Sequence, residues 1–462
     1  MKLVKQIPLF FLILILLVPC GCKGNDPSNE DNDKLIYVAP NGTGDGTSEA
    51  SPTTIYAAIS KSKPGSRILV KAGTYNLLSQ VSLSATKSGE NNRMISIESL
   101  NNEKPVFDFG GMMKEGIDIE GNYWHIKGIE VCNAMQGIRI GEGSYNIIEN
   151  CVAHHNAGTG ISLGFGHGAV NNGSRCSYNQ IINCDAYLNF DYQTANNLSP
   201  GENADGFACK MKAGKGNQFI GCRSWRNSDD GWDFFESGYA ITVINCWTWS
   251  NAQIDDFKEV YLRKVGNILT STLFHGNGNG FKMGGNHSND KPDCTNQSTG
   301  THVFRNCISF GNFLAGKDGH SGFSQNDHRD GAIIENCLSF NNNENYRFWA
   351  EPNPGKTFIL RNNISFYPKG RGDKFVVATE ASNNSWNLSL QGDSTQFVSL
   401  SEADALAPRK ADGSLPSNFG RLKSASLFID KGIATQPLQY DGVSLPAIDF
   451  KGTLPDLGAL EY

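Results

Sequence analysis

A short motif built around a cysteine recurs along the middle of the chain. Each copy is a run of β-branched or apolar residues that passes through the cysteine and ends in Asn, as in IIENCVAHHN at 147–156 and VINCWTWSN at 243–251. A degenerate copy stands at 360–368, and we expect a hidden copy at 267–277, with Thr272 in the cysteine position. The period is then about 22–38 residues, which indicates a repeat architecture. The cysteines of the six complete copies are Cys151, Cys184, Cys222, Cys246, Cys307 and Cys337.

The composition of the copies indicates which repeat architecture they form. None carries the helical periodicity over ten or more residues that ankyrin or tetratricopeptide repeats require. Short strands joined by bends, each pairing with the equivalent strand one turn later at about 4.8 Å, fit a parallel β-helix. The 51 glycines among 462 residues also favour turns over long helices. The sequence therefore predicts an all-β solenoid.

Stacked turns would align equivalent side chains into ladders. We expect the six motif cysteines to be reduced and to pack as small buried hydrophobes, although twelve cysteines in an exported chain would otherwise suggest disulfides. We also expect the asparagine before the cysteine to bond the buried backbone of the bends, which needs partners. This second ladder would comprise Asn150, Asn183, Asn245, Asn306 and Asn336.

A second motif follows the first with the same period. It places a glycine before an aromatic or aliphatic residue, and the glycine would permit a bend while the larger residue points into the coil. The residues on either side of this pair would then point outward and form a column on one face. The copies are Thr159–Ser162, Asp205–Ala208, Asp230–Asp233, Asn279–Lys282 and Ser321–Ser324.

The first 34 residues do not carry the repeat. Lys2 and Lys5 precede an apolar run at 7–18, too short to span a bilayer, and Cys20 and Cys22 follow it. This pattern predicts a lipoprotein-type signal peptide at 1–22, lipidated at one of the two cysteines, and a flexible polar tether at 23–34. We expect an exported protein, held at the outer membrane or cell surface only by a lipid anchor, or otherwise secreted or periplasmic.

The rest of the chain divides where the repeat ends. Short strands on either side of a helical stretch near 53–63 would form an N-terminal cap and first turn. The β-helix domain would cover 35–369, and 370–462 would end the coil and cover it. The net charge of −6 argues against a nucleic-acid partner, and we expect a monomer.

Four aspartates belong to the outward column or flank it. Asp205 and Asp230 hold equivalent positions on neighbouring turns, and Asp229 and Asp233 lie on the same bend as Asp230. Four carboxylates this close would repel one another, unless their pKa values rise or they share a cation. Asp-Asp-Gly by itself is also an ordinary turn sequence. The second aspartate one turn away favours a metal site, and an all-carboxylate ligand set favours Ca²⁺ over Mg²⁺ or Zn²⁺.

Lys282 stands in the column of Asp233, and we expect it two turns further along, about 10 Å away by the strand spacing. Lys258 is a rival on the turn between, and either residue could instead be a solvated surface lysine. A cation on a uronate carboxylate would make the C5 proton more acidic. It would also lower the pKa of a neighbouring lysine, which could then act as general base. The chemistry predicted is β-elimination with a 4,5-unsaturated product, favoured at alkaline pH.

Three strings resemble polysaccharide lyase family 9: Asn203-Ala-Asp-Gly-Phe-Ala, Asn227-Ser-Asp-Asp-Gly-Trp-Asp and Gly278-Asn-Gly-Phe-Lys-Met-Gly-Gly. The resemblance covers about 35–462, and Met283 departs from it where Leu is more usual. It implies a right-handed parallel β-helix of the pectin-lyase-like type that acts on pectic polymers of plant cell walls. It also implies Lys282 as the base and four Ca²⁺ ligands, namely Asp205, Asp229, Asp230 and Asp233. The family includes enzymes on polygalacturonate and on rhamnogalacturonan I, and the motifs do not separate the two.

Other residues are weaker candidates for binding substrate. Trp225, with Trp247 and Trp249, could form a platform for sugar rings, although these residues could equally pack against the coil. Four basic residues could clamp uronate carboxylates, namely Lys210, Lys212, Arg226 and Arg263.

Two other functions compete with the lyase. An inverting glycoside hydrolase on the same fold could use Asp205, Asp229 and Asp230 as acid and base, with carboxyls about 6.5–9.5 Å apart, but it gives Lys282 no role. A non-catalytic polysaccharide-binding β-helix would explain the repeat and the anchor but not the aspartate cluster.

Overall fold

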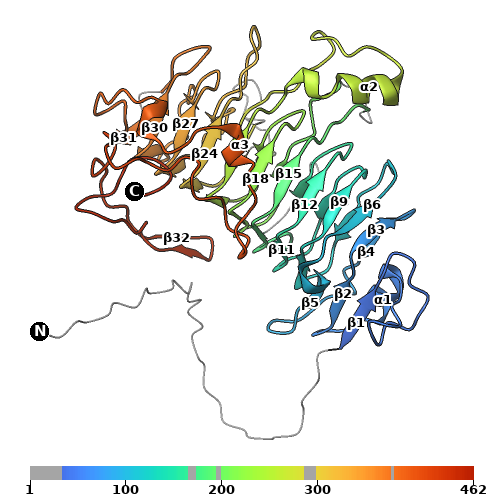
Figure 1. Ribbon diagram of the computed structural model, residues 1–462. Helices are drawn as coiled ribbons and strands as arrows, with labels where there is room; N and C mark the ends of the chain where they lie inside the picture. The colour runs from blue at the N-terminus through green and yellow to red at the C-terminus, as the bar shows by residue number, and fades with distance from the viewer. Residues whose placement is uncertain (1–33, 165–172, 194–198, 286–297, 376–378) are drawn as a thin grey trace, which may run out of the picture. The chain divides into compact units, whose positions relative to one another are not determined.

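Successive turns of the repeat add strands to three parallel sheets, as Figure 1 shows. The structure is a computed structural model that describes residues 34–164, 173–193, 199–285, 298–375 and 379–462. The predicted signal peptide and all but the last residue of the predicted tether lie outside these residues. Residues 34–462 form one structural unit, which is the predicted right-handed parallel β-helix.

The described strands fall into the three sheets in the order of the turns. Sheet A contains β1 (Leu35–Val38), β2 (Arg67–Val70), β5 (Ile95–Ser99), β8 (Trp124–Lys127), β11 (Ile147–Glu149), β14 (Gln180–Ile182), β17 (Gln218–Ile220), β20 (Thr242–Ile244), β23 (His302–Arg305), β26 (Ala332–Glu335), β29 (Phe358–Arg361) and β31 (Thr379–Ser382). Sheet B contains β3 (Gly73–Asn76), β6 (Pro105–Asp108), β9 (Glu130–Cys132), β12 (Val152–His154), β15 (Asp185–Tyr187), β18 (Arg223–Trp225), β21 (Trp247–Trp249), β24 (Ile308–Phe310), β27 (Leu338–Phe340) and β30 (Ile364–Phe366). Sheet C contains β4 (Val81–Leu83), β7 (Ile117–Ile119), β10 (Ile138–Ile140), β13 (Ile161–Gly164), β16 (Phe207–Lys210), β19 (Trp232–Asp233), β22 (Phe281–Lys282), β25 (Phe323–Ser324) and β28 (Tyr346–Arg347).

Short helices and one hairpin accompany the sheets. They are α1 (Ile55–Lys61), α2 (Lys258–Val265), α3 (Glu402–Ala405), the antiparallel pair β32 (Leu438–Tyr440) and β33 (Val443–Leu445), and 3₁₀ turns at Leu100–Asn102, Ile254–Asp256 and Ser394–Gln396. α1 lies within the predicted helical stretch, and the Thr54 hydroxyl caps it by accepting a hydrogen bond from Ala57 N.

Ladders of identical or similar side chains fill the coil. The six motif cysteines are completely buried and free, which confirms the prediction of reduced, packed thiols. The large residues of the second motif stack face to face inside sheet C, with the Phe207 and Trp232 ring centroids 4.7 Å apart and those of Trp232 and Phe281 4.9 Å apart. Because the inward side chains of each strand stack on their equivalents one turn away, every strand has a fixed register on its neighbour.

The buried asparagine ladder is not the one predicted from the sequence. The asparagines before the cysteines adopt left-handed backbone, with φ of 52° at Asn150 and 53° at Asn245, and most of them are half-buried or exposed. The ladder instead uses the asparagine that ends each copy. Asn189 Oδ1, for example, accepts hydrogen bonds from Asn156 N and Nδ2, at 3.1 and 2.9 Å. The other members are Asn227, Asn251, Asn312 and Asn342.

The longest gap between cysteines holds an insertion and not an additional turn. Val243 of β20 pairs directly with Phe304 of β23, so these residues stand one turn apart. The predicted hidden copy at 267–277 is therefore wrong: it forms no strand and follows α2, which projects from the coil (Figure 1).

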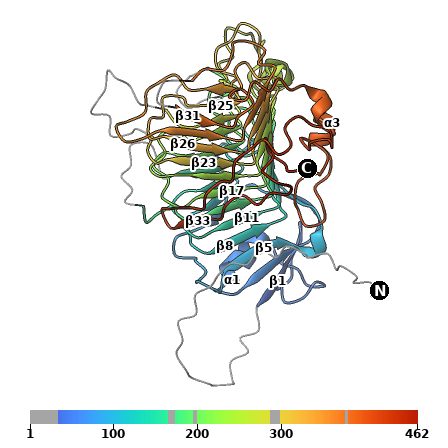
Figure 2. The same cartoon turned by 90° about the vertical axis from the view of Figure 1, so that its left-hand side faces the viewer.

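The C-terminal segment lies along the coil after β31. Phe397, Phe419 and Phe428 belong to one buried apolar cluster with Trp247 and Phe310 of sheet B. Figure 2 shows the rungs of sheet A stacked one above another, with α3 and the C-terminus beside them. The described residues contain no helix with the length and apolar character needed to cross a bilayer.

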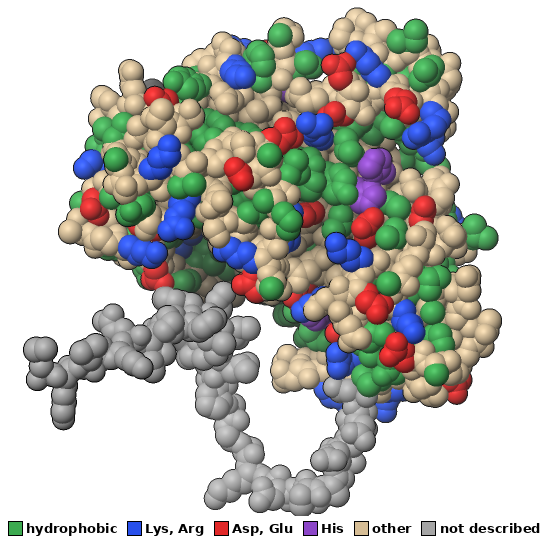
Figure 3. Space-filling view, in the orientation of Figure 1, with side chains coloured by type: hydrophobic (Ala, Val, Ile, Leu, Met, Phe, Trp, Pro, Cys, Tyr) green, Lys and Arg blue, Asp and Glu red, His purple; other side chains and the backbone are tan. Residues whose placement is uncertain are grey.

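The aromatic stack on the outer side of sheet B extends past this cover. Trp225 stacks on Trp249 with ring centroids 5.0 Å apart, and the stack continues through Tyr187 to His154. Figure 3 shows histidine and hydrophobic side chains together on this face of the molecule.

Candidate active site

Four consecutive strands of sheet C position the polar residues of the second motif. β13, β16, β19 and β22 pair in parallel, and their register aligns Ala208 with Asp233 and Asp233 with Lys282. Just before these strands, Gly206 N donates a hydrogen bond to Asp230 O at 3.0 Å, so Asp205 and Asp230 stand on adjacent turns. The carboxylates of Asp205, Asp229 and Asp230 offer oxygens within 4.8 Å of one another.

The glycine of the motif serves close packing. A Cβ on Gly206 would overlap with Ser224 Oγ, and one on Gly231 would overlap with Thr248 Oγ1. Glycine at these positions therefore lets sheet C approach sheet B and brings the aspartate before it into the buried interior of the site. Asp205 and Asp230 are both 0% exposed.

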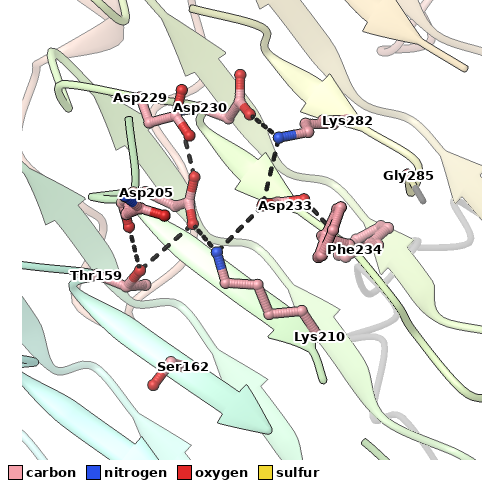
Figure 4. A network of polar contacts seen from close by, with 12 residues as sticks. Thr159, Ser162, Asp205, Lys210, Asp229, Asp230, Asp233, Phe234, Lys282 and Gly285 are labelled. Carbon is pink, nitrogen blue, oxygen red and sulfur yellow. Dashed lines mark hydrogen bonds and ion pairs between the residues drawn. The ribbon is translucent and has the colours of Figure 1, made fainter. Parts of the chain in front are cut away.

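Hydrogen bonds fix one oxygen of each carboxylate. Asp230 Oδ1 accepts from Asn279 N at 2.7 Å and Nδ2 at 2.9 Å, and Asp229 Oδ1 accepts from Asn277 N at 2.7 Å. Asp233 Oδ1 accepts from the backbone of the following bend. This anchoring leaves Oδ2 of Asp230 and Asp233 directed toward the cluster, as Figure 4 shows.

Two lysines complete the cluster. Lys282 Nζ lies 3.0 Å from Asp230 Oδ2 and 3.4 Å from Asp233 Oδ2. Lys210 Nζ lies 2.8 Å from Asp205 Oδ2 and 3.1 Å from Asp233 Oδ2 (Figure 4). Lys282 is therefore one turn from Asp233 and in contact with it, whereas the sequence places it two turns away. The difference follows from the insertion, which the sequence counts as a turn.

Burial and mutual repulsion set the protonation of the aspartates. Burial raises the pKa of Asp205 to about 7 and that of Asp229 well above its usual value, with repulsion from the neighbouring carboxylates adding to both. The pKa of Asp230 is raised for the same reasons. Burial alone would raise the pKa of Asp233 as well, but Lys210 and Lys282 hold it below its usual range.

The surrounding carboxylates favour the charged form of Lys282. Burial alone would lower the pKa of Lys282, but attraction to Asp230, Asp233, Asp229 and Asp205 raises it well above its usual value. The lowered pKa predicted from the sequence applies to an amine beside a bound cation, and it stays a prediction. The structure adds direct ion pairs to the carboxylates, and these favour the charged amine.

The donor set fits a divalent cation. Four carboxylates face two ammonium groups, so the fully ionised cluster carries two uncompensated negative charges. Asp230 Oδ2 is buried, and its close contact among the described residues is the ion pair with Lys282 Nζ at 3.0 Å. An exclusively oxygen set with spare lone pairs suits Ca²⁺. Asp205, Asp229 and Asp230 could hold such an ion.

The comparisons with known proteins agree with the fold. Over residues 36–363 the sequence matches the family described as Pel9A-like, right handed beta helix region. This chain belongs to polysaccharide lyase family 9. It is 34% identical to pectate lyase L of Dickeya chrysanthemi, in an alignment that covers 98% of this chain and 96% of that protein.

Two solved lyase structures superpose on most of this chain. The crystal structure of pectate lyase Pel9A superposes with a TM-score of 0.74 at 33% identity, over 92% of this chain and 96% of that one. A rhamnogalacturonan lyase superposes with a TM-score of 0.68 at 28% identity, over 85% of this chain and 97% of the other.

The remaining candidate residues of the lyase lie away from the cluster. Arg226 pairs with Asp256 and with Glu402 of the C-terminal segment, at 3.4 and 3.2 Å, and Trp225 stacks beneath that cover. These contacts make both residues part of the packing of sheet B. Arg263 and the rival base Lys258 are exposed on α2, where Lys258 pairs with Asp255.

Lys210 ends β16 and Lys212 follows it, and the two have different surroundings. Lys212 lies in a left-handed bend past the strand, where its N donates to Glu236 O. Lys210 sits inside the carboxylate cluster, so it does not present its ammonium group to the outside as a clamp would.

The lyase has a further basic residue on the outward column that the sequence motif does not reveal. Arg347 of β28 lies in register with Ser324, which is in register with Lys282. Asn345, and not a glycine, precedes the aromatic Tyr346 of its strand, so a search for the Gly-aromatic pattern passes over it. The only available signal is the aromatic Tyr346, which continues the stack of Phe281 and Phe323.

Proposed function

We propose that the protein is a Ca²⁺-dependent lyase that cleaves uronate-containing pectic polymers by β-elimination. The observation that carries this proposal is a buried cluster of four carboxylates and two lysines, in which the amine of Lys282 contacts Asp230 and Asp233. Relatives named pectate lyase L and rhamnogalacturonan lyase support the pectic substrate class. Both polygalacturonate and rhamnogalacturonan I remain substrates to test.

Lys282 is proposed as the general base. Its unprotonated amine would accept the proton from C5 of the uronate next to the cleaved bond. The electron pair of the C5–H bond forms the C4–C5 double bond, and the C4–O bond breaks with its electrons leaving on oxygen. That oxygen takes up a proton, and Lys282 gives the proton from C5 back to solvent. Water is not consumed, and the product is a 4,5-unsaturated uronate. Asp230 and Asp233 position the amine through contacts of 3.0 and 3.4 Å.

The aspartates are proposed to hold the cation. Asp205, Asp229 and Asp230 would be the main ligands, and Asp233 would contribute its Oδ2 in competition with the two lysines. When bound, the ion would neutralise the uronate carboxylate and so acidify C5. It would also offset the carboxylate charges that keep Lys282 protonated, and this favours the free amine.

The geometry disfavours the hydrolase alternative. Three of the carboxylates come within 4.8 Å of one another, whereas an inverting hydrolase separates its acid and base by about 6.5–9.5 Å to admit a water. The Asp230 and Asp233 carboxylates are moreover engaged by Lys282, which has no role in hydrolysis.

One assay separates the functions. The protein is incubated with polygalacturonate and, separately, with rhamnogalacturonan I, with calcium and with a chelator, while ultraviolet absorbance and reducing ends are followed. The proposal expects absorbance from the conjugated double bond with calcium and its loss with chelator. Reducing ends without absorbance would establish hydrolysis. The absence of both signals would indicate a binding protein without catalytic activity.

We also propose that the protein is exported and lipidated, on the basis of the sequence at 1–22. Expression in a bacterial host, followed by membrane fractionation and mass spectrometry of the N-terminal peptide, tests this. A lipid-modified peptide that is lost when both Cys20 and Cys22 are changed to Ala supports the anchor, and an unmodified protein in the medium contradicts it.

A further inference from the structure

We propose that Arg347 and Lys374 form a subsite that binds the carboxylates of an acidic polysaccharide two to three sugars beyond the cleaved bond. This inference rests on the proposed function for the position of that bond. It also specifies the direction in which the polymer lies on sheet C, from the aspartate cluster toward the C-terminal turns.

The register of sheet C places both residues on the column of Lys282. Lys282 pairs with Ser324, Ser324 with Arg347, and Arg347 with Lys374. With about 4.8 Å between turns, the backbone of Arg347 lies about 10 Å from that of Lys282 and the backbone of Lys374 about 14 Å away. These steps are close to the length of one sugar unit each. Ser324 is small, so the two long basic side chains are not separated by a bulky one.

Packing holds the Arg347 guanidinium in place. It lies over the Trp349 ring with its central carbon 4.6 Å from the ring centroid. The backbone of Trp349 is in turn held by its own N–H, which donates to the buried side-chain oxygen of Gln325 at 2.8 Å. A stacked guanidinium is already ordered, so it loses less freedom when it binds a carboxylate in bidentate fashion.

The charge of Arg347 is only weakly compensated by its neighbour. The ion pair between Arg347 Nε and Glu344 Oε1 is 3.8 Å long. The same Glu344 oxygen is held at 2.8 Å by Arg371, and its other oxygen accepts from Ser321. Arg347 therefore keeps hydrogen-bonding capacity for a ligand.

Lys374 adds a second cation on the next turn. Its side chain is exposed, and its backbone is tied to β28 by hydrogen bonds from Lys374 N to Tyr346 O and from Phe348 N to Lys374 O, at 2.9 and 2.7 Å. The lysine is thus presented on the same column as Arg347 by ordered backbone.

The opposite end of the column has a different charge. There Arg139 is bonded to Asp118 at 2.9 Å and to Glu120 at 3.1 Å. Two carboxylates against one guanidinium make that end unfavourable for a polyanion. The asymmetry assigns the run of uronates to the C-terminal side of Lys282.

Binding and kinetics of matched variants test the subsite. The test compares Arg347→Ala, Arg347→Lys and the control Lys369→Ala, which removes an exposed charge outside the column of Lys282. A lost charge-assisted contact corresponds to about a tenfold loss of affinity. We expect Arg347→Ala to raise KM for long polygalacturonate about tenfold with a much smaller effect on kcat, and Arg347→Lys to restore part of the loss. The control should match the wild type.

Chain length and direct binding decide the interpretation. The KM defect should be smaller on digalacturonate, which places only one sugar beyond the cleaved bond and is therefore too short to reach Arg347. Calorimetric titration of the polymer into Lys282→Ala protein, with and without Arg347→Ala, measures binding without turnover. Weaker binding by the double variant supports the subsite. If the wild type forms no unsaturated product, this result still stands and only the proposed function fails. Equal binding, or a KM change independent of chain length, would overturn the subsite.

Discussion

Lys210 occupies the position of an internal competitor for the cation. Its ammonium lies 2.8 Å from Asp205 Oδ2 and 3.1 Å from Asp233 Oδ2. A calcium ion bound to the same Asp205 oxygen, at about 2.4 Å, would come within about 5 Å of this charge. At an effective dielectric constant of about 20, charges of +2 and +1 at that distance repel by about 7 kcal/mol.

The measured effect should be smaller than this electrostatic limit. The Lys210 side chain is 17% exposed, so it can turn outward when the ion binds, and much of the repulsion is relieved. We therefore expect Lys210→Met, which keeps the length of the aliphatic stem, to tighten calcium binding by about 2 kcal/mol, or roughly thirtyfold.

Isothermal titration calorimetry of calcium into chelator-treated protein measures this difference. Lys258→Met on α2 is the control, because it removes an exposed lysine that pairs only locally with Asp255, and its affinity should equal that of the wild type. Calcium affinity that is unchanged or weaker in Lys210→Met would refute the reasoning, since Lys210 would then support the site and not compete for it.

Two further predictions concern the cation site and acid stability. Asp230→Asn keeps the shape and one acceptor of a side chain whose Oδ1 is bonded to Asn279, but it removes a ligand charge. We expect calcium affinity, measured by calorimetry, to fall at least tenfold. Unchanged affinity would exclude Asp230 as a ligand. His328 is completely buried, and burial lowers its pKa to about 4, so below about pH 6.5 the unfolded chain binds a proton that the folded protein does not. Protonation of this group in the unfolded chain should lower the free energy of unfolding by about 3 kcal/mol between pH 7 and pH 4. Denaturant unfolding should show a smaller loss of this free energy over the same pH range in His328→Gln than in the wild type. Equal losses in the two proteins would contradict a role for His328.

The repeat made the coil predictable from the sequence. A cysteine that returns with each turn has to stack on its equivalents, and in the structure Cys151 N donates to Cys184 Sγ at 3.4 Å across one turn. The alignment of Asp205 with Asp230 follows from the same periodicity, because both precede the Gly-aromatic pair of adjacent turns. Periodicity alone therefore predicts the carboxylate cluster.

The sequence predictions that are wrong concern places where the period is interrupted or where the sequence does not determine the direction of a side chain. The insertion around α2 has the length of an extra turn, so the sequence alone placed Lys282 too far from Asp233. The copy at 147–156 holds both Asn150 and Asn156, and only the backbone shows that the first adopts the left-handed bend while the second points inward. Arg347 lacks the preceding glycine and could be assigned to the column only through strand register.

The most direct test of the whole account combines two measurements on Lys282→Ala protein. Calcium titration should show one bound ion with an affinity at least equal to that of the wild type, since the variant keeps all four aspartates and loses one competing cation. On polygalacturonate or rhamnogalacturonan I, whichever the wild type cleaves, the same protein should release no 4,5-unsaturated product. Unsaturated product formed at the wild-type rate would contradict the account, because the amine in contact with Asp230 and Asp233 would then not be the base.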